Sequence, residues 1–220
     1  MVLEKEFYKK RERAACAGIL RAQLSMHMTA DLAHLLPLAA VTVCFVARMA
    51  EVFTKREVVA GKKREGVTFR LFMLCGMLAT FGGIAEFLLR DLVLRWPTFV
   101  LGAVCSLASF AIRRAAIRAL GKFWSLHVER REGHEFVSGG PFAYARHPVY
   151  FSMILELLGI GLHVNAWIMQ AIVFAIFVPT LIVRVRNEER ALLEKFGDAY
   201  SRYMQTTPAI VPGFGVGREP

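Results

Sequence analysis

Long apolar runs separated by short basic stretches dominate the first half of this chain. Three of them cover residues 31–53, 67–89 and 98–112, and the third continues into a basic segment that begins at Arg113. A helix needs about twenty mainly apolar residues to cross roughly 30 Å of hydrocarbon. Small residues inside the second run suit close packing between spanning helices. We therefore predict three transmembrane helices within residues 31–112.

Two further apolar runs follow, at residues 149–162 and 167–183, with a turn predicted at residues 163–166 between them. The first run is short for a membrane span, and the turn is tight. We therefore predict an antiparallel helical hairpin over residues 149–183. Both open ends of such a hairpin lie on one face of the membrane.

Charged residues surround these runs at both ends of the chain. Residues 1–30 alternate charge with small apolar residues, which fits an interfacial arm. Residues 184–204 carry apolar and aromatic side chains among charges, which is typical of an amphipathic helix. The whole pattern predicts an all-α integral membrane protein with about five transmembrane helices. Its parts are the arm, a three-helix region over 31–112, and a region over 113–220 that holds the hairpin and the C-terminal helix.

Composition supports the membrane assignment. The 220 residues are 55% hydrophobic, with a mean hydropathy of +0.43 and a formal net charge of +10. Because the basic residues lie between apolar blocks and not along one face, we expect anionic lipid headgroups as partners and no nucleic acid. Eighteen Lys and Arg flank the spans on the side of the hairpin's open ends, against eight on the other side. The positive-inside rule places those open ends in the cytosol, although the N-terminal arm on the other side is itself basic.

The polar stretch from Gly133 to Tyr150 is the main candidate for chemistry, because burying so many polar groups without partners is costly. His147 and Tyr150 stand three residues apart at the start of the hairpin, so they share a helix face. Arg184 and Glu188 stand four apart at its other open end and also share a face. This spacing suits either a functional site or a helix-capping ion pair. The hairpin brings the two pairs together.

The polar region contains two other candidate features. Gly139, Gly140 and Pro141 can form a tight turn, either an ordinary loop or one whose amides face an anion. By residue type, a metal ion would be held by His127, His134, His147 and Glu188. These histidines lack close helical spacing, and the four cysteines contain no C-x-x-C pair. We therefore predict buried thiols and no metal site.

Several motifs in this part of the chain occur in a fixed order. Residues 134–150 read H-x-x-V-x-x-G-P-F-x-Y-x-R-H-P-x-Y, Asn165 lies in the hairpin turn, and residues 184–203 read R-x-x-x-E-E-x-x-L-x-x-x-F-G-x-x-Y-x-x-Y. Together they resemble the isoprenylcysteine carboxyl methyltransferase family, whose members are integral membrane methyltransferases related to phospholipid methyltransferases. The resemblance covers about residues 120–212, and the first hundred residues match only as generic spans.

The resemblance implies S-adenosyl-L-methionine as methyl donor, bound by the region over 113–220. The positions that match the family's cofactor-binding residues are His134, Val137, Phe142, His147, Tyr150, Glu188 and, less closely, His127. Arg184 matches a position linked to the acceptor's carboxylate or its orientation. Arg146 and Tyr144 belong to the motif, and we expect them to shape the site. Phe142 stands where tyrosine is common in the family, and the tail lacks an arginine often found there.

The leading hypothesis is a methyltransferase acting on a lipophilic or lipidated acceptor through a carboxylate or hydroxyl. Such a reaction needs positioning, exclusion of water and oriented charge, and no metal or covalent nucleophile. Alternatives are N-methylation of a phospholipid headgroup, a membrane reductase that shares the C-terminal pattern, and a non-catalytic membrane protein. We expect the protein in a bacterial inner membrane rather than in the endoplasmic reticulum.

Overall fold

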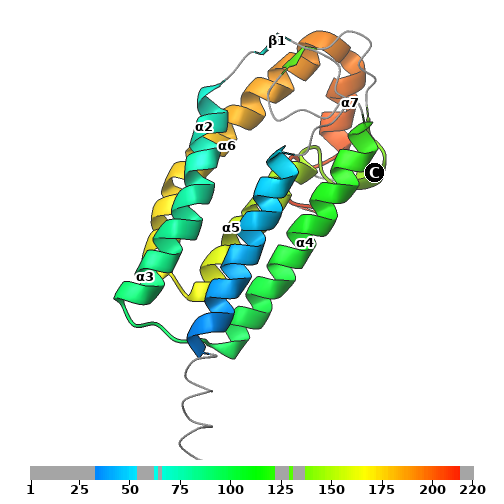
Figure 1. Ribbon diagram of the computed structural model, residues 1–220. Helices are drawn as coiled ribbons and strands as arrows, with labels where there is room; N and C mark the ends of the chain where they lie inside the picture. Colours follow the sequence, from blue (N-terminus) through cyan, green and yellow to red (C-terminus); the bar gives the residue numbers. More distant parts are fainter. Residues whose placement is uncertain (1–32, 54–61, 64–65, 122–128, 131–136, 214–220) are drawn as a thin grey trace, which may run out of the picture.

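A computed structural model describes residues 33–53, 62–63, 66–121, 129–130 and 137–213 of the chain. These residues form a bundle of helices that run roughly alongside one another (Figure 1). The exception is one antiparallel pair of two-residue strands, β1 (Lys62–Lys63) and β2 (Glu129–Arg130). The all-α prediction is thus confirmed for the described part. The arm over 1–30, His127 and His134 lie outside the described residues.

Among the described residues, four helices are long and apolar enough to cross a membrane, and a fifth apolar helix is shorter. The four are the first helix (Ala33–Phe53), the continuous rod of α2 (Val67–Met77), η1 (Leu78–Gly82) and α3 (Gly83–Leu89), α4 (Trp96–Leu120), and α6 (Trp167–Phe196). The shorter one is α5 (Pro148–Val164), which has 17 residues. The first span, the second span and the hairpin therefore lie where the apolar runs predicted them.

Two helices extend further than their apolar runs. Helix α4 covers residues 96–120 and not 98–112, because the Arg- and Ala-rich segment after the apolar run consists of good helix formers. Helix α6 continues to Phe196, so residues 184–204 are helical as predicted, but their first part belongs to α6 and the helix is interrupted at Gly197. Gly197, with a φ of +52°, ends α6 and α7 (Asp198–Thr206) follows it. A positive φ is accessible to glycine at little cost, which explains the break.

The closed end of the hairpin is fixed by contacts from other helices. The turn consists of Asn165 and Ala166, with His163 still inside α5, so the predicted turn over 163–166 is shorter than expected. Asn165 adopts the left-handed conformation, and its side-chain carbonyl accepts a hydrogen bond from Thr98 of α4 at 2.8 Å. The Glu86 carboxylate of α3 accepts the backbone N–H groups of Ile168 and Met169 at 3.3 and 2.7 Å. Glu86 therefore satisfies amides that the first turn of α6 leaves without helical partners.

Exposed side chains on the helix surfaces mark the depth of a membrane. Trp96 and Trp167 are the first residues of α4 and α6, which begin at the lower end of the molecule in Figure 1, and they are 60% and 51% exposed. Arg114 and Arg186 of the same helices are exposed toward the upper end. At a rise of about 1.5 Å per residue, each Trp lies roughly 27–29 Å below its Arg. Tryptophan favours the membrane interface and arginine the headgroups, so this spacing matches the hydrocarbon thickness of a bilayer.

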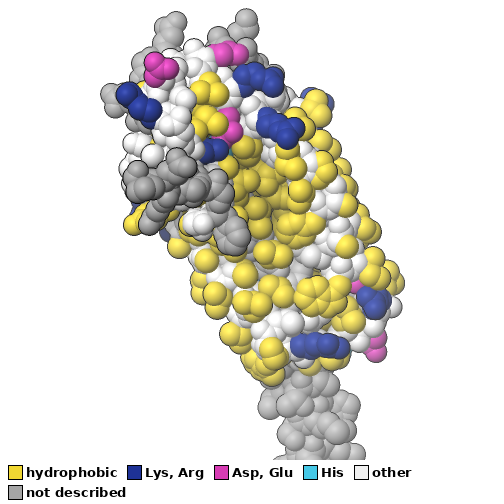
Figure 2. Space-filling model, turned by 180° about the vertical axis from the view of Figure 1, so that it is seen from behind, with side chains coloured by type: hydrophobic (Ala, Val, Ile, Leu, Met, Phe, Trp, Pro, Cys, Tyr) yellow, Lys and Arg dark blue, Asp and Glu magenta, His cyan; other side chains and the backbone are white. Residues whose placement is uncertain are grey.

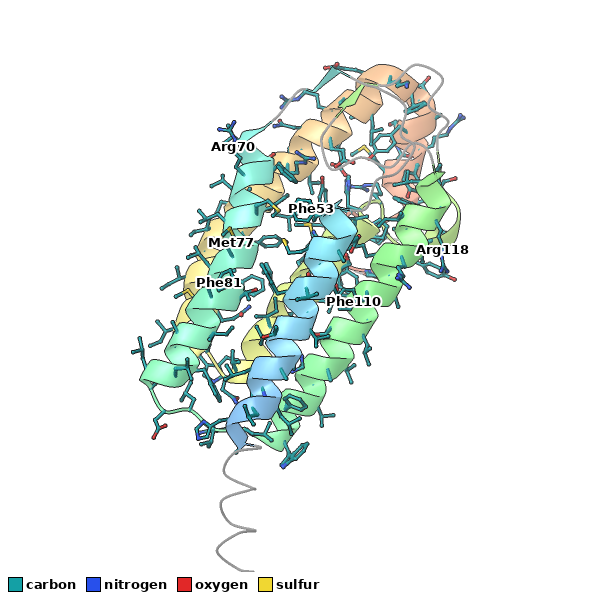
Figure 3. All side chains as sticks on the ribbon, in the orientation of Figure 1. Phe53, Arg70, Met77, Phe81, Phe110 and Arg118 are labelled. Carbon is teal, nitrogen blue, oxygen red and sulfur yellow. The ribbon has the colours of Figure 1, made fainter. Side chains whose placement is uncertain are left out.

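Figures 2 and 3 show the same separation between the hydrophobic surface of the bundle and its charged upper end. Figure 2 shows hydrophobic side chains covering most of one face below the charged upper end. In Figure 3, Arg70 and Arg118 lie toward the upper end of α2 and α4, while Met77 and Phe81 lie further down. The described part of the chain is therefore built as a membrane-embedded bundle with a polar upper end.

Helices α4 and α5 pack closely at a pair of glycines. A Cβ built on Gly102 would lie 3.0 Å from the carbonyl oxygen of Gly159, and one on Gly159 would lie 2.5 Å from the Ser106 hydroxyl. Side chains at these positions would separate the two helices. The missing side chains at Gly102 and Gly159 thus let α4 pack directly against α5.

Candidate functional site

The hydroxyl of Tyr150 connects the two open ends of the hairpin. Tyr150, at the start of α5, donates a hydrogen bond to Oε2 of Glu188 on α6 at 2.6 Å. The same hydroxyl accepts a hydrogen bond from Nε of Arg184, also on α6, at 3.0 Å. The structure therefore brings together Tyr150, Arg184 and Glu188, which the hairpin prediction placed near one another.

Arg184 extends this network to a third helix. Its side chain is buried, with 4% of the residue exposed, and its Nη1 donates to the hydroxyl of Thr68 on α2 at 3.0 Å. Buried charges are costly unless they are hydrogen-bonded. The contacts of Arg184 therefore join α2, α5 and α6 at one level of the bundle. The interpretation of Arg184 and Glu188 as a simple ion pair omits the hydroxyl between them.

His147 lies between two glutamates of α6. Its ring stacks on that of Tyr150 with centroids 5.5 Å apart and an interplanar angle of 25°. Its Nε2 lies 3.2 Å from Oε1 of Glu189, and its Nδ1 lies 4.0 Å from Oε2 of Glu188. His147 is buried, while the Glu188 side chain keeps 34% of its surface exposed. The accessible carboxylate at this end is thus next to a pair of stacked aromatic rings.

Arg146 fastens the polar stretch to the end of α7 and to Glu189. Its Nε and Nη2 lie 2.9 and 2.8 Å from Oε1 of Glu189. Its Nη1 donates to the backbone carbonyls of Met204 and Thr207 at 2.8 and 2.6 Å. These contacts are with the protein's own acceptors, so they fit the expectation that Arg146 shapes the site.

The tail runs beside the same residues through main-chain hydrogen bonds. The backbone N–H groups of Arg146 and His147 donate to the carbonyls of Pro208 and Ala209, each at 2.8 Å. This short backbone pairing holds the segment after α7 against the residue that precedes α5. The polar stretch, the hairpin and the tail therefore meet in one region.

The glycine-rich segment forms a single turn of 3₁₀ helix, η3 (Gly140–Ala143), and Gly140 has a φ of +62°. The amide of Phe142 donates to the carbonyl of Gly139, so this amide closes the turn. Phe142 is buried, and its carbonyl accepts a hydrogen bond from the Tyr203 hydroxyl of α7. Val137 is half-buried, whereas Tyr144 is 70% exposed. The turn prediction is confirmed, and Tyr144 lies on the surface.

Two tyrosines of α7 keep their protons near this region. Burial raises the pKa of Tyr203 to about 12, and the positive charge of Arg146 acts in the opposite direction. Burial also raises the pKa of Tyr200, and the negative charges of Glu189 and Glu188 add to the effect. Both phenols therefore remain neutral at physiological pH. The Tyr203 hydroxyl acts as a hydrogen-bond donor, as its contact with Phe142 requires.

No group of three His, Cys, Asp or Glu side chains in the described ranges is arranged to hold a metal ion. His147 and Glu188 do lie near one another, and their contacts are with protein groups. His127 and His134, the two other histidines that could hold a metal ion by residue type, fall outside those ranges.

The sequence patterns missed three contributors. Glu189, part of the E-E pair, is the residue that Arg146 and His147 contact, and helical spacing alone does not separate its role from that of Glu188. Thr68 carries no motif, and only the packing of α2 against α6 brings it to Arg184. Tyr203 belongs to the final Y-x-x-Y pattern, which gives no indication of its bond to Phe142.

Comparison with known proteins identifies the family. Residues 100–194, which extend from the first turns of α4 into the last turn of α6, match the model of the isoprenylcysteine carboxyl methyltransferase family. A protein-S-isoprenylcysteine O-methyltransferase from Schizosaccharomyces pombe is 26% identical over 160 residues, covering 67% of this chain and 68% of that protein. The uncharacterized protein YpbQ from Bacillus subtilis is 30% identical over 163 residues, covering 70% of this chain and 95% of that protein.

A third relative is named for metal resistance and not for methyl transfer. The cobalt-zinc-cadmium resistance protein CzcN from Cupriavidus metallidurans is 28% identical over 137 residues, or 59% of this chain. The alignment spans 60% of the length of CzcN. Because the family model covers the hairpin with its motifs, and YpbQ aligns over nearly its whole length, the chain belongs to the isoprenylcysteine carboxyl methyltransferase family.

Proposed function

We propose that this protein is a membrane methyltransferase that uses S-adenosyl-L-methionine to methylate a lipophilic acceptor at a carboxylate or hydroxyl. The observation that carries the proposal is the network of Tyr150, Arg184 and Glu188 beside the stacked ring of His147. Relatives named protein-S-isoprenylcysteine O-methyltransferase support the same activity. The donor's sulfonium supplies a methyl group that is already activated.

The residues at the open end fit such a donor. Its ammonium group needs a carboxylate, and Glu188 is the better candidate because its side chain remains 34% exposed. Glu189, in contrast, is occupied by Arg146 and His147. We propose that Glu188 binds the ammonium group, with Tyr150 and His147 fixing the direction of the carboxylate.

The remaining assignments follow from the sequence resemblance and stay proposals. Val137 and Phe142 are apolar groups for the adenine, and His134 and His127 complete the predicted donor-binding set. Arg146 supports this set indirectly, by binding Glu189 and the backbone carbonyls at the end of α7. Its contacts favour a structural role in positioning the donor site over contact with reacting atoms.

Arg184 is proposed to orient the acceptor side of the reaction. The resemblance links it to the acceptor's carboxylate or to its orientation. Because its guanidinium is buried and binds Tyr150 and Thr68, the contacts favour orientation. A fixed positive charge at this level also stabilises negative charge on an acceptor oxygen as it approaches the methyl group.

An apolar layer directly below the network suits a lipophilic acceptor. The ring of Phe72 on α2 lies 6.1 Å from that of Tyr150 and 5.3 Å from that of Phe177 on α6. An acceptor with a hydrocarbon chain can keep its chain among such side chains while its polar end reaches the network. We propose that this end of the bundle faces the cytosol of a bacterial inner membrane, following the positive-inside rule.

The proposal is tested by donor binding and methyl transfer with the full chain in detergent or nanodiscs. We expect micromolar binding of the donor or its demethylated product, and transfer of labelled methyl to a lipid-soluble acceptor. Base-labile label indicates an ester, and stable label on nitrogen indicates headgroup methylation. Glu188→Gln is expected to weaken donor binding about tenfold to a hundredfold, because a hydrogen bond between charged groups is worth roughly 1.5–3 kcal/mol. Glu194→Gln, at an exposed position of the same helix, is the matched control. Equal affinities for the two variants contradict the proposal.

A further inference from the structure

A second charged cluster lies inside the bundle and takes no part in the proposed chemistry. It consists of Arg48 and Glu51 on the first helix, Arg113 on α4 and Glu156 on α5. Arg113 is fully buried, and Glu156 is 9% exposed. Ionisable groups inside a membrane protein are costly, and they are usually retained for a function.

Arg113 makes the closest contacts of the cluster, and they are with α5. Its Nη2 lies 2.5 Å from Oε2 of Glu156, and its Nε donates to the Ser152 hydroxyl at 3.0 Å. The contacts of the first helix are looser, with Glu51 3.5 Å from Nη1 of Arg113 and Arg48 3.9 Å from Glu156. Nη1 of Arg113 has no hydrogen-bond partner among the described residues. The guanidinium is therefore directed at α5 and is only loosely held from the first helix.

Ser152 is the centre of a clamp on the first turns of α5. It is fully buried, and its backbone carbonyl accepts a hydrogen bond from the Ser109 hydroxyl of α4 at 2.7 Å. Its own hydroxyl donates to the carbonyl of Val149 at 2.6 Å. Arg113 and Ser109 stand four residues apart on one face of α4, so they hold the backbone and side chain of Ser152 together.

The clamp lies on the opposite side of α5 from the functional site. Ser152 follows Tyr150 by two residues, which corresponds to about 200° around a helix. While Ser152 faces α4, Tyr150 faces Arg184 on α6 and Phe72 on α2. Any rotation or sliding of α5 against α4 therefore moves the Tyr150 hydroxyl relative to Arg184 and Glu188.

We propose that Arg113 is a positioning residue for the methyl-transfer site: through Ser152 and Glu156 it fixes the rotation of α5 and so the position of the Tyr150 hydroxyl. The inference rests on the proposed function for its catalytic consequence. Its structural part, the fixed position of α5, stands without it. A buried ion pair commonly adds little net stability over apolar residues of similar size, which leaves specificity of packing as its role.

The test removes the charges without emptying the space. The double variant Arg113→Met with Glu156→Leu keeps the volume and leaves Arg48 and Glu51 as a balanced pair. We expect its melting temperature in detergent to match the wild type. We expect amide exchange at residues 149–152 to become at least about tenfold faster, because the hydrogen bond from Arg113 to Ser152 is lost and only the one from Ser109 remains. Arg114→Met changes the exposed neighbour of Arg113 on the same helix and is the matched control.

The kinetic readout separates positioning from folding. We expect the double variant to raise the donor's KM about tenfold and lower kcat about a hundredfold, because small misplacements in a site have effects of this size. The acceptor's KM stays unchanged. Arg113→Lys retains the charge near Glu156, but a single nitrogen replaces the fork that also reaches Ser152, so its kcat lies between those of the wild type and the double variant.

Each outcome decides one claim. Wild-type exchange over 149–152 together with wild-type kinetics in the double variant overturns the inference. If the wild-type protein neither binds the donor nor transfers methyl, the proposed function fails, while the exchange comparison still decides the positioning of α5. If the double variant does not fold, Ser152→Ala takes its place, with faster exchange expected at residues 149–152 and unchanged exchange overturning the inference.

Discussion

The two ends of the α5–α6 hairpin are both polar, yet they use their carboxylates differently. At the closed end, Glu86 accepts hydrogen bonds from two backbone amides of α6 and forms an ion pair with Arg90 at 2.8 Å. At the open end, Glu188 accepts one hydroxyl, that of Tyr150, and its side chain stays one-third exposed. A carboxylate whose oxygens already accept hydrogen bonds from backbone amides caps a helix. An accessible carboxylate beside oriented side chains is suited to bind a ligand.

Replacing the buried arginine of the open end is expected to have the largest effect. Arg184→Ala removes the charge that binds the Tyr150 hydroxyl and that we propose orients the acceptor, and we expect turnover to fall about 10²- to 10³-fold. Donor affinity should change less than about threefold, because Glu188, which binds the donor's ammonium group in our proposal, remains. Donor titration and single-turnover kinetics with labelled donor measure the two effects. The reverse pattern, lost affinity with retained turnover, would assign Arg184 to the donor pocket.

A smaller loss is expected when only the connecting hydroxyl is removed. Tyr150→Phe keeps the ring against His147 and Phe72 but breaks the hydrogen bonds to Arg184 and Glu188. We expect donor affinity to fall about tenfold, or roughly 1.4 kcal/mol. Tyr144→Phe, at an exposed tyrosine of the same stretch, serves as the control. An affinity for Tyr150→Phe equal to the control's shows that the hydroxyl does not orient Glu188.

The closed end should respond in stability and not in binding. In Glu86→Gln the amide group faces the N–H groups of α6 that the carboxylate accepted, so we expect the protein to lose about 1–3 kcal/mol of stability. Donor affinity should stay at the wild-type value. Thermal melting and donor titration of the same preparation measure both quantities, and Asp91→Asn is an exposed acidic control nearby. Weakened donor binding at unchanged stability would remove the distinction between the two ends.

The smallest effect concerns the bond between α7 and η3. Tyr203→Phe removes the donor to the Phe142 carbonyl, at a cost of about 1 kcal/mol in stability. Because burial raises the folded pKa of Tyr203 from 10.0 to about 12, its contribution is complete below pH 10 and is lost as the pH rises from there toward 12. The melting temperature of the wild type should therefore fall more steeply over that interval than that of Tyr203→Phe. Parallel curves would contradict this account.

Helical spacing and the order of apolar runs determined most of the fold. The runs at 31–53 and 67–89 became spanning helices, and the short run before Asn165 became the first limb of a hairpin. Because a hairpin returns the chain to its starting side, the convergence of Tyr150 with Arg184 and Glu188 followed from the sequence. The ends of α4 and α6 did not follow, since charged residues with good helix propensity continue a helix beyond its apolar part.

The tertiary structure decided the burial and the contacts of residues that are adjacent and alike in sequence. Arg113 and Arg114 are adjacent and alike in sequence, but Arg113 is buried against Glu156 and Arg114 is exposed. Glu188 and Glu189 are likewise adjacent, and Arg146 and His147 occupy the second while the first stays accessible. Sequence spacing fixes the face of a helix to within a turn. The partner of each side chain depends on helices far away in the sequence, because a buried charge is retained only where another element supplies its counter-charge or hydrogen bond.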